Sequence, residues 1–271
     1  MKRFTTFVQR HPLVTFFVLA YALSWVWIIL PDAPLYPMGP LFAALIVSAL
    51  AEGRAGVRTL LGRAFRWRTG LRWYAVALGL PAIIVSLGAL VNIWLGAPAP
   101  DADQLAGWPM LFVPFVFRFI LIGLGEEPGW RGYALPRLQK GRSALAASLV
   151  LGLIWAGWHL PLLIQDYGFK PVAWIPALLS TIFSSVTMAW IFNNTNSSAW
   201  MTALFHASYS TLGNQFFFHI FSGADSARQG WLDAGMWAVM AVVVVVLAGS
   251  ERLSRAPVQQ PEIVAKPVAE V

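Results

Sequence analysis

The chain has no cysteine and few charged residues, and both absences narrow what it can be. Without cysteine it forms no disulfide and offers no thiolate as a nucleophile or a metal ligand. Only 11% of its 271 residues are charged and 58% are hydrophobic, whereas an ordinary soluble domain has about 25% charged residues. No polar stretch is long enough to form a second, soluble domain, and no internal repeat is present. This composition is typical of an integral membrane protein.

Apolar runs long enough to cross a hydrocarbon core of about 30 Å recur along the whole chain. We predict an all-α, polytopic membrane bundle of about eight transmembrane helices, at roughly 13–30, 38–52, 72–95, 109–126, 144–164, 172–192, 198–219 and 233–250. The first run is followed by no good small-residue cleavage site, so we expect a signal anchor. The expected organisation is one membrane domain, 1–255, followed by a disordered cytoplasmic tail, 256–271.

The basic residues lie unevenly along this arrangement. All 19 lysines and arginines except Arg118, Lys170 and Arg228 fall in the termini and connections on one side of the eight helices. Because cytoplasmic connections carry an excess of lysine and arginine, both termini are predicted to be cytoplasmic, and we expect the cell (plasma) membrane as the location. The arginine-rich stretch 52–72 is expected to be a loop on the inner lipid surface. Membrane lipid is therefore an expected partner, and nucleic acid is not.

Two adjacent carboxylates, Glu126 and Glu127, lie at the end of a strongly apolar segment. An ionisable group inside a membrane segment costs a few kcal/mol and is by default a hypothesis of a functional site. Arg131 follows Glu127 by four residues, so on a helix it can hold Glu127 ionised. Glu126 then points about 100° away from this pair and is the candidate general base. The alternative is an ordinary charge cluster at a helix end.

Two histidines lie well inside predicted spans. His159 is in LIWAGWHLPLL, and His206 is in LFHASYSTLGN with Ser210 four residues later on the same helical face. Taken singly, an intramembrane histidine more often packs or hydrogen-bonds than catalyses. A helical hairpin turning at 140–142 would place Glu126 and His159 at similar depth, and His206 lies about 12 Å into its span at 1.5 Å per residue. We therefore expect these three side chains to meet in the cytoplasmic half of the membrane.

Together, the motifs resemble those of a known family. EEPGWRGYALPRLQ is similar to the EExxxR motif of the type II CAAX prenyl endopeptidase family, the CPBP or Abi group of intramembrane proteases, which also includes bacteriocin-immunity proteins. WAGWH resembles the second motif, FxxxH, with Trp155 where phenylalanine is expected. NTNSSAWMTALFHASYS resembles the third, HxxxN or HxxxD, but Ser210 stands at its last position. The resemblance covers about residues 110–215.

This resemblance implies an intramembrane endopeptidase that hydrolyses a membrane-associated protein, of the prenylated CAAX type, near the cytoplasmic face. It implies that Glu126 activates water and that Arg131 clamps Glu127. It also implies that His159 and His206 orient the water or stabilise the oxyanion. Ser210 has a shorter reach than asparagine, and losing one good oxyanion donor typically lowers the rate by about 10²–10³.

The resemblance leaves the cofactor open. One alternative is zinc held by Glu126, His159 and His206, and the other is a metal-free mechanism in which Glu126 acts as the base. The sequence has no HExxH spacing and so gives the zinc alternative no independent support.

Two other functions also stay open. A non-catalytic membrane scaffold or bacteriocin-immunity-type protein would retain the same core, and Ser210 favours it. A transporter or channel is the third alternative, but its polar groups should line a path across both leaflets, whereas these cluster on one side.

Overall fold

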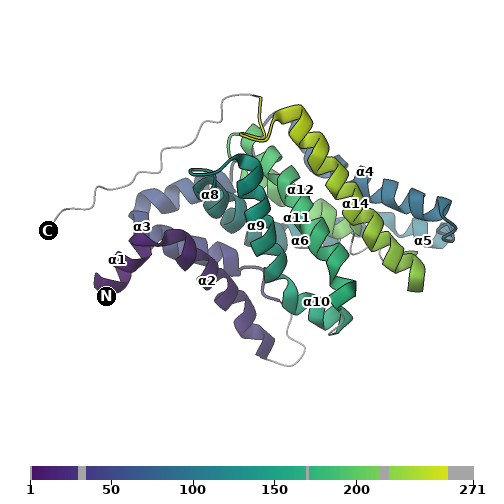
Figure 1. The fold of residues 1–271 in the computed structure, drawn as a ribbon, viewed down its shortest axis with the longest axis horizontal. Coiled ribbons are helices and arrows are strands. Elements are labelled where there is room, and N and C mark those ends of the chain that lie inside the picture. Colours follow the sequence, from purple (N-terminus) through teal and green to yellow (C-terminus); the bar gives the residue numbers. More distant parts are fainter. Residues whose placement is uncertain (1, 30–34, 169–170, 214–219, 256–271) are drawn as a thin grey trace.

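Every regular element in the described part of the chain is a helix, which confirms the all-α class. The computed structural model describes residues 2–29, 35–168, 171–213 and 220–255, so the predicted tail 256–271 lies outside the described residues. The helices, shown in Figure 1, are α1 (Lys2–Arg10), α2 (Pro12–Trp25), η1 (Val26–Ile29), α3 (Gly39–Ala64), α4 (Leu71–Trp94), α5 (Ala102–Ala106), η2 (Trp108–Leu111), α6 (Phe112–Arg118), η3 (Phe119–Gly123), α7 (Leu124–Glu127), η4 (Pro128–Ala134), α8 (Leu135–Leu138), α9 (Ala144–Trp158), α10 (Leu160–Tyr167), α11 (Pro171–Asn194), α12 (Ala199–Ser210) and α14 (Gly223–Ala248). Of these, η1 and η2 are 3₁₀ helices and η3 and η4 are π-helices.

Five of these helical stretches are long and apolar enough to cross a membrane. They are Gly39–Ala64, Leu71–Trp94, Ala102–Leu138, Ala173–Asn194 and Gly223–Ala248. A sixth crossing results if α9 and α10, which meet at 46°, form one span, and the apolar helix Pro12–Ile28 is shorter. Each of the eight predicted segments coincides with a described helix, at least in part. The number of crossings and the side of the termini stay predictions.

The arginine-rich stretch 52–72 is mostly helical, so the predicted loop is wrong for residues 52–64. α3 continues to Ala64, with one non-helical residue at Gly53 (φ 65°, ψ −151°) where the helix is kinked. Glycine adopts such a positive φ without the steric cost that a Cβ atom imposes. Alanine, leucine and arginine, which dominate this stretch, are strong helix formers, and their propensity prevails over the polar character that suggested a loop.

The segment that carries the first motif lies in the middle of the bundle. α7 and η4 pack against both α3 and α12. Around them, α11 packs against α9 and α14, and α4 packs against α12 and α14 (Figure 1). The motif is therefore enclosed by helices from both halves of the sequence.

Glycines of the motif segment allow this close packing. A Cβ atom on Gly129 would lie 2.5 Å from the carbonyl oxygen of Pro40 in α3. A Cβ atom on Gly123 would lie 2.7 Å from the carbonyl oxygen of Ala203 in α12. Both distances are too short for any larger residue, so these two glycines set how closely the neighbouring backbones approach.

Two π-helical segments flank the two glutamates. In η3 the N–H of Leu124 donates to Phe119 O, and at the end of η4 the N–H of Leu135 donates to Trp130 O, both five residues back. π-Helical turns are rare and occur frequently at functional sites. Pro128 begins η4 and has no N–H to donate, which weakens the α-helical pattern there.

The predicted hairpin turn is confirmed. α8 ends at Leu138, and α9 begins at Ala144, where the hydroxyl of Ser143 accepts a hydrogen bond from Ala146 N–H at 3.2 Å. His159 lies at the junction of α9 and α10, where the chain bends by 46°. Pro161, two residues later, favours this break because a proline interrupts the helical hydrogen bonds.

Candidate active site

Glu127 and Arg131 form a buried ion pair, as the sequence predicts. The Nη1 atom of Arg131 lies 2.9 Å from Oε1 of Glu127, and both side chains are fully buried. Nη2 of Arg131 donates to the hydroxyl of Ser185 at 3.2 Å, and that hydroxyl donates to Ser148 O at 3.0 Å. The guanidinium also lies 4.2 Å from the ring centroid of Trp155. These contacts from η4, α9 and α11 fix the pair, because a buried charge is tolerated only when it is paired and hydrogen-bonded.

Glu126 points to the other side and is held by two tryptophans. Its Oε2 accepts hydrogen bonds from the indole N–H groups of Trp155, at 2.9 Å, and Trp130, at 3.3 Å. The side chain is 2% exposed. Among the described residues, no donor contacts Oε1. One oxygen of Glu126 is therefore fixed and the other is left for a water or a substrate.

His206 joins Glu127 rather than Glu126. Its Nδ1 lies 3.0 Å from Oε1 of Glu127, the oxygen that Arg131 also contacts. A carboxylate oxygen only accepts, so the proton is assigned to Nδ1, which donates to Glu127. Glu127 therefore contacts a candidate catalytic histidine in addition to Arg131, the partner that the sequence predicts.

His159 is fixed in the same tautomer from another direction. Its Nδ1 lies 2.9 Å from the backbone oxygen of Trp155 and donates to it. Its ring packs edge-on against Trp155 and Trp158, with centroid distances of 5.4 and 4.9 Å. Both histidines therefore leave Nε2 as the nitrogen that can face a reactant.

Trp155 lies at the centre of the predicted site. Its indole contacts Glu126 and Arg131, and its ring centroid is 5.2 Å from that of His206. His159 bonds to its backbone oxygen. The structure thus brings together five of the predicted residues, Glu126, Glu127, Arg131, His159 and His206, through direct contacts or through Trp155.

Ser210 stands apart from this group. Its hydroxyl donates to the backbone oxygen of Ala207 in its own helix, at 3.4 Å, and the residue is buried. None of the hydrogen bonds in the described part of the chain joins Ser210 to a glutamate or histidine of the site. Asn214, one turn farther along, lies outside the described residues.

Three hydrogen-bond donors or acceptors of the site are not predicted from the sequence. Trp155 stands where the family motif has phenylalanine, which suggests packing and not a hydrogen bond, and no motif includes a role for Trp130 or Ser185. Trp130 follows Glu126 by four residues, which places both on one helical face, and this spacing could have indicated the contact. The contact of Ser185 depends on the packing of α11 and has no local signal.

The donors do not form a metal site. Within the described ranges, no three histidine, aspartate or glutamate side chains converge closely enough to hold a metal ion. The Nδ1 hydrogen bonds would suit metal-binding histidines, but Glu126, His159 and His206 do not complete such a set. The hydrolysis is therefore described with the side chains alone.

Comparisons with known proteins bear on the same region. Residues 106–212 match the family model described as Type II CAAX prenyl endopeptidase Rce1-like. A curated relative, CAAX prenyl protease 2 of Methanococcus maripaludis, is 26% identical over 179 residues, which cover 62% of this chain and 66% of the relative. The chain thus spans just under two thirds of that relative's length. The matched region contains every residue of the candidate site.

Proposed function

We propose that this chain, which belongs to the type II CAAX prenyl endopeptidase (CPBP) family, is an intramembrane endopeptidase that uses Glu126 as its base. Its apolar helices and its family indicate an integral membrane protein. One observation carries the assignment: one oxygen of Glu126 is fixed by two indole N–H groups, and the other has no partner among the described residues. Trp155, which donates one of these bonds, also packs against His159 and His206. We expect the site to lie at the cytoplasmic side of the plasma membrane.

The reaction is the addition of water to a peptide carbonyl. Oε1 of Glu126 takes a proton from the water as its oxygen forms a bond to the carbonyl carbon, and the carbonyl oxygen becomes an oxyanion. The same proton is then given to the amide nitrogen as the C–N bond breaks, so the glutamate is regenerated. The products are a carboxylic acid and an amine, and the acid then gives its proton to the amine or to solvent.

His159 and His206 act on the reacting group through Nε2. In this proposal they orient the water or, when protonated, donate to the oxyanion. Glu127 and Arg131 do not touch the substrate. They hold His206 at the position and in the tautomer that the reaction needs, in the way that a carboxylate orients a catalytic histidine elsewhere.

A lipidated protein is the substrate class that we propose, because the matched relative is a CAAX prenyl protease. An apolar groove between α4, α6 and α12 favours this proposal, because it could hold the hydrocarbon chain of a lipidated substrate. Its volume is about 410 Å³, and it is lined by Trp67, Tyr74, Leu78, Phe115, Trp200 and Leu204. Leu204 lies on the helix that carries His206.

The test compares two peptides with the purified protein in proteoliposomes. One carries a farnesylated cysteine three residues before its C-terminus, and the other has the same sequence without the lipid. Cleavage after the cysteine of the farnesylated peptide, lost in Glu126→Ala, is the expected result. Cleavage in Glu126→Ala at the wild-type rate would refute the role of Glu126, and equal cleavage of both peptides would refute the substrate class.

A second candidate is a non-catalytic scaffold or immunity-type protein of the same family. The observation that favours it is Ser210, whose hydroxyl is bound to its own helix and so supplies no obvious donor to an oxyanion. Under this alternative, the double variant Glu126→Gln/His206→Ala would keep full biological activity while its binding to a protein partner persists.

A further inference from the structure

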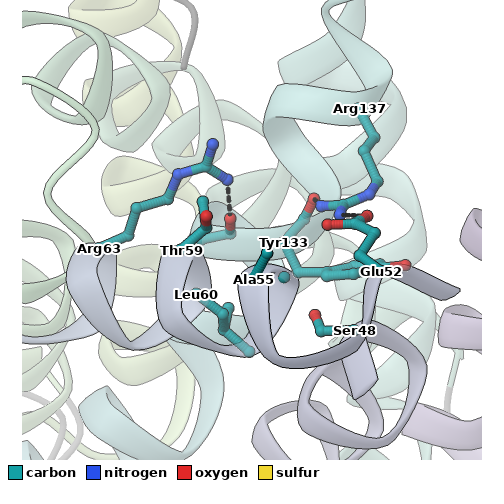
Figure 2. A pocket seen from close by; sticks show the side chains of 10 residues that line it. Ser48, Glu52, Ala55, Thr59, Leu60, Arg63, Tyr133 and Arg137 are labelled. Atoms are coloured by element: carbon teal, nitrogen blue, oxygen red, sulfur yellow. Dashed lines mark hydrogen bonds and ion pairs between the residues drawn. The ribbon is translucent and has the colours of Figure 1, made fainter. Parts of the chain in front are cut away.

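The end of the first motif, GYALPR (residues 132–137), takes no part in the proposed chemistry, yet it lines a second polar pocket. Gly132, Tyr133 and Arg137 form one wall of this pocket. The other wall comes from α3 on both sides of its kink, through Ser48, Glu52, Ala55, Gly56, Thr59, Leu60 and Arg63 (Figure 2). The enclosed space is only about 20 Å³, close to the room that one water molecule needs, so a larger ligand has to displace a side chain of the lining.

Hydrogen-bond donors in this pocket outnumber the acceptors that they contact. Arg63 is 2% exposed, and its Nη1 donates to Gly132 O at 2.6 Å. Its Nε and Nη2, the hydroxyl of Ser48 and the hydroxyl of Tyr133 are buried and have no partner among the described residues. Buried polar groups are nearly always satisfied, so such a concentration of unpaired donors indicates a missing acceptor.

The charges of the lining residues also indicate that this pocket binds an acceptor. Arg137 pairs with Glu52, the one carboxylate among the lining residues, as the dashed line in Figure 2 shows. The charged groups that act on Arg63 are Arg137, Glu52 and Arg66. Among the lining residues, two guanidinium groups, those of Arg63 and Arg137, thus accompany one carboxylate, and the missing acceptor should be an anion.

The guanidinium of Arg137 is already held in one orientation by contacts with Tyr133. Its guanidinium lies 3.6 Å from the ring centroid of Tyr133, and its Nη1 donates to Tyr133 O at 2.8 Å. These contacts orient the group independently of Glu52, whose carboxylate occupies the place that an incoming anion would take. Planar guanidinium groups bind phosphate and carboxylate oxygens in pairs, with strong, charge-assisted hydrogen bonds.

The surroundings favour a lipid as the source of the anion. Arg54 and Arg58 follow the kink of α3 and are exposed near the pocket. The sequence predicts this end of the bundle to be cytoplasmic, where anionic lipids attract basic segments, and basic pockets between membrane helices bind lipid headgroups there. We propose that the pocket between α3 and η4 binds the phosphate group of an anionic phospholipid, with Arg63, Arg137 and Tyr133 as donors and with Glu52 released from Arg137.

The experiment measures lipid retention by the purified, full-length protein in a neutral detergent. Native mass spectrometry is used to compare phosphatidylglycerol with phosphatidylcholine of the same acyl chains. We expect the wild type to retain phosphatidylglycerol preferentially and Arg63→Gln to lose about tenfold in this preference, since one charge-assisted bond is lost. Arg58→Gln removes an exposed arginine from the same helix and is the matched control. Equal losses in the two variants would overturn the proposal.

Two further variants keep the test decisive if Arg63→Gln does not fold. Tyr133→Phe removes only a hydroxyl that has no partner, and it should weaken phosphatidylglycerol retention with no loss of thermal stability. Glu52→Gln removes the competing carboxylate and should increase retention. Weaker retention in Glu52→Gln would overturn the proposal.

A third arm separates a lipid headgroup from a free phosphate. Thermal stability is measured with inorganic phosphate alone and with vesicles of phosphatidylglycerol. Stabilisation by the vesicles but not by inorganic phosphate supports the lipid. Equal stabilisation by inorganic phosphate would overturn the assignment to a lipid. Because binding is read without proteolysis, failure here leaves the proposed protease activity untouched.

Discussion

Nδ1 of His206 lies 3.0 Å from Oε1 of Glu127, the same oxygen that forms the ion pair with Arg131. One carboxylate oxygen thus joins the first and third motifs, which are separated by 79 residues. The two adjacent glutamates differ in what surrounds them: Glu127 is bound by a guanidinium and an imidazole, whereas Glu126 is bound by two indoles.

Replacing Glu126 with glutamine should abolish turnover. Glutamine keeps the size and can still accept the indole hydrogen bonds, but it cannot take a proton from water, and losing a general base lowers rates by about 10²–10⁴. The rate is measured with a lipidated peptide in proteoliposomes. Expression and thermal stability should equal those of the wild type, and retained turnover would exclude Glu126 as the base.

Trp155→Phe should lower kcat about tenfold and leave KM nearly unchanged. The ring packing against His159 and His206 is kept, whereas the N–H that fixes Oε2 of Glu126 is lost; a neutral or charge-assisted hydrogen bond is worth about 1–3 kcal/mol. Trp158→Phe is the matched control, because the indole N–H of Trp158 is buried without a partner in the described structure. If kcat falls equally in both variants, the hydrogen bond from the Trp155 indole to Glu126 does not contribute to turnover.

Arg131→Met should destabilise the protein strongly. It leaves the fully buried carboxylate of Glu127 without its main counter-charge, and breaking a buried pair in this way costs about 3–5 kcal/mol. The double variant Glu127→Gln/Arg131→Met removes both charges and should be less destabilised than Arg131→Met. Thermal unfolding in detergent measures both. A double variant that is destabilised as much as Arg131→Met, or more, would show that the two charges do not stabilise each other.

Ser210→Ala should change turnover by less than about threefold, since the hydroxyl bonds only to its own helix and an exchange of this kind away from special features has little effect. The same peptide assay measures it. A loss of a hundredfold or more would show that Ser210 rotates toward the reacting group during turnover, which the described geometry does not contain.

Gly129→Ala should lower thermal stability by an amount equivalent to about 1–3 kcal/mol, the usual effect of overpacking. The added methyl group would lie 2.5 Å from Pro40 O, so α3 and η4 must separate. Gly141→Ala, in the turn between α8 and α9, has no atom within 4 Å of the added carbon and should leave stability unchanged. Equal melting temperatures for the two variants would contradict the close approach.

The sequence contains enough to predict the class of fold and most members of the candidate site. Apolar runs locate helices because membrane spans must satisfy their own backbone groups, and the charges inside those runs identify Glu126, Glu127 and Arg131. The partners of these charges were harder to predict. The match of depth grouped Glu126, His159 and His206, which in the structure all contact Trp155, but depth says nothing about rotation around a helix axis.

Rotation decides that His206 faces Glu127 and that Trp155 faces Glu126. It depends in part on the π-helical turns beside the glutamates, which do not follow from hydrophobic periodicity. The helical course of residues 52–64 is hard to predict for a different reason. A basic stretch between apolar runs resembles a polar connection, although many of its residues favour a helix.

The two π-helical segments have a consequence for how this region tolerates changes in length. A π turn accommodates one residue more than an α-helical turn, so removing one residue from η3 can restore regular α-helix there. Because the π turn has absorbed that residue, the side chains before and after the deletion would keep nearly the same faces, whereas a deletion from a regular α-helix rotates all later side chains by about 100°. The glutamates would therefore keep their tryptophan and histidine partners. A single-residue deletion in η3 should thus be tolerated, whereas one in α9 before Trp155 should abolish the site as completely as loss of Glu126.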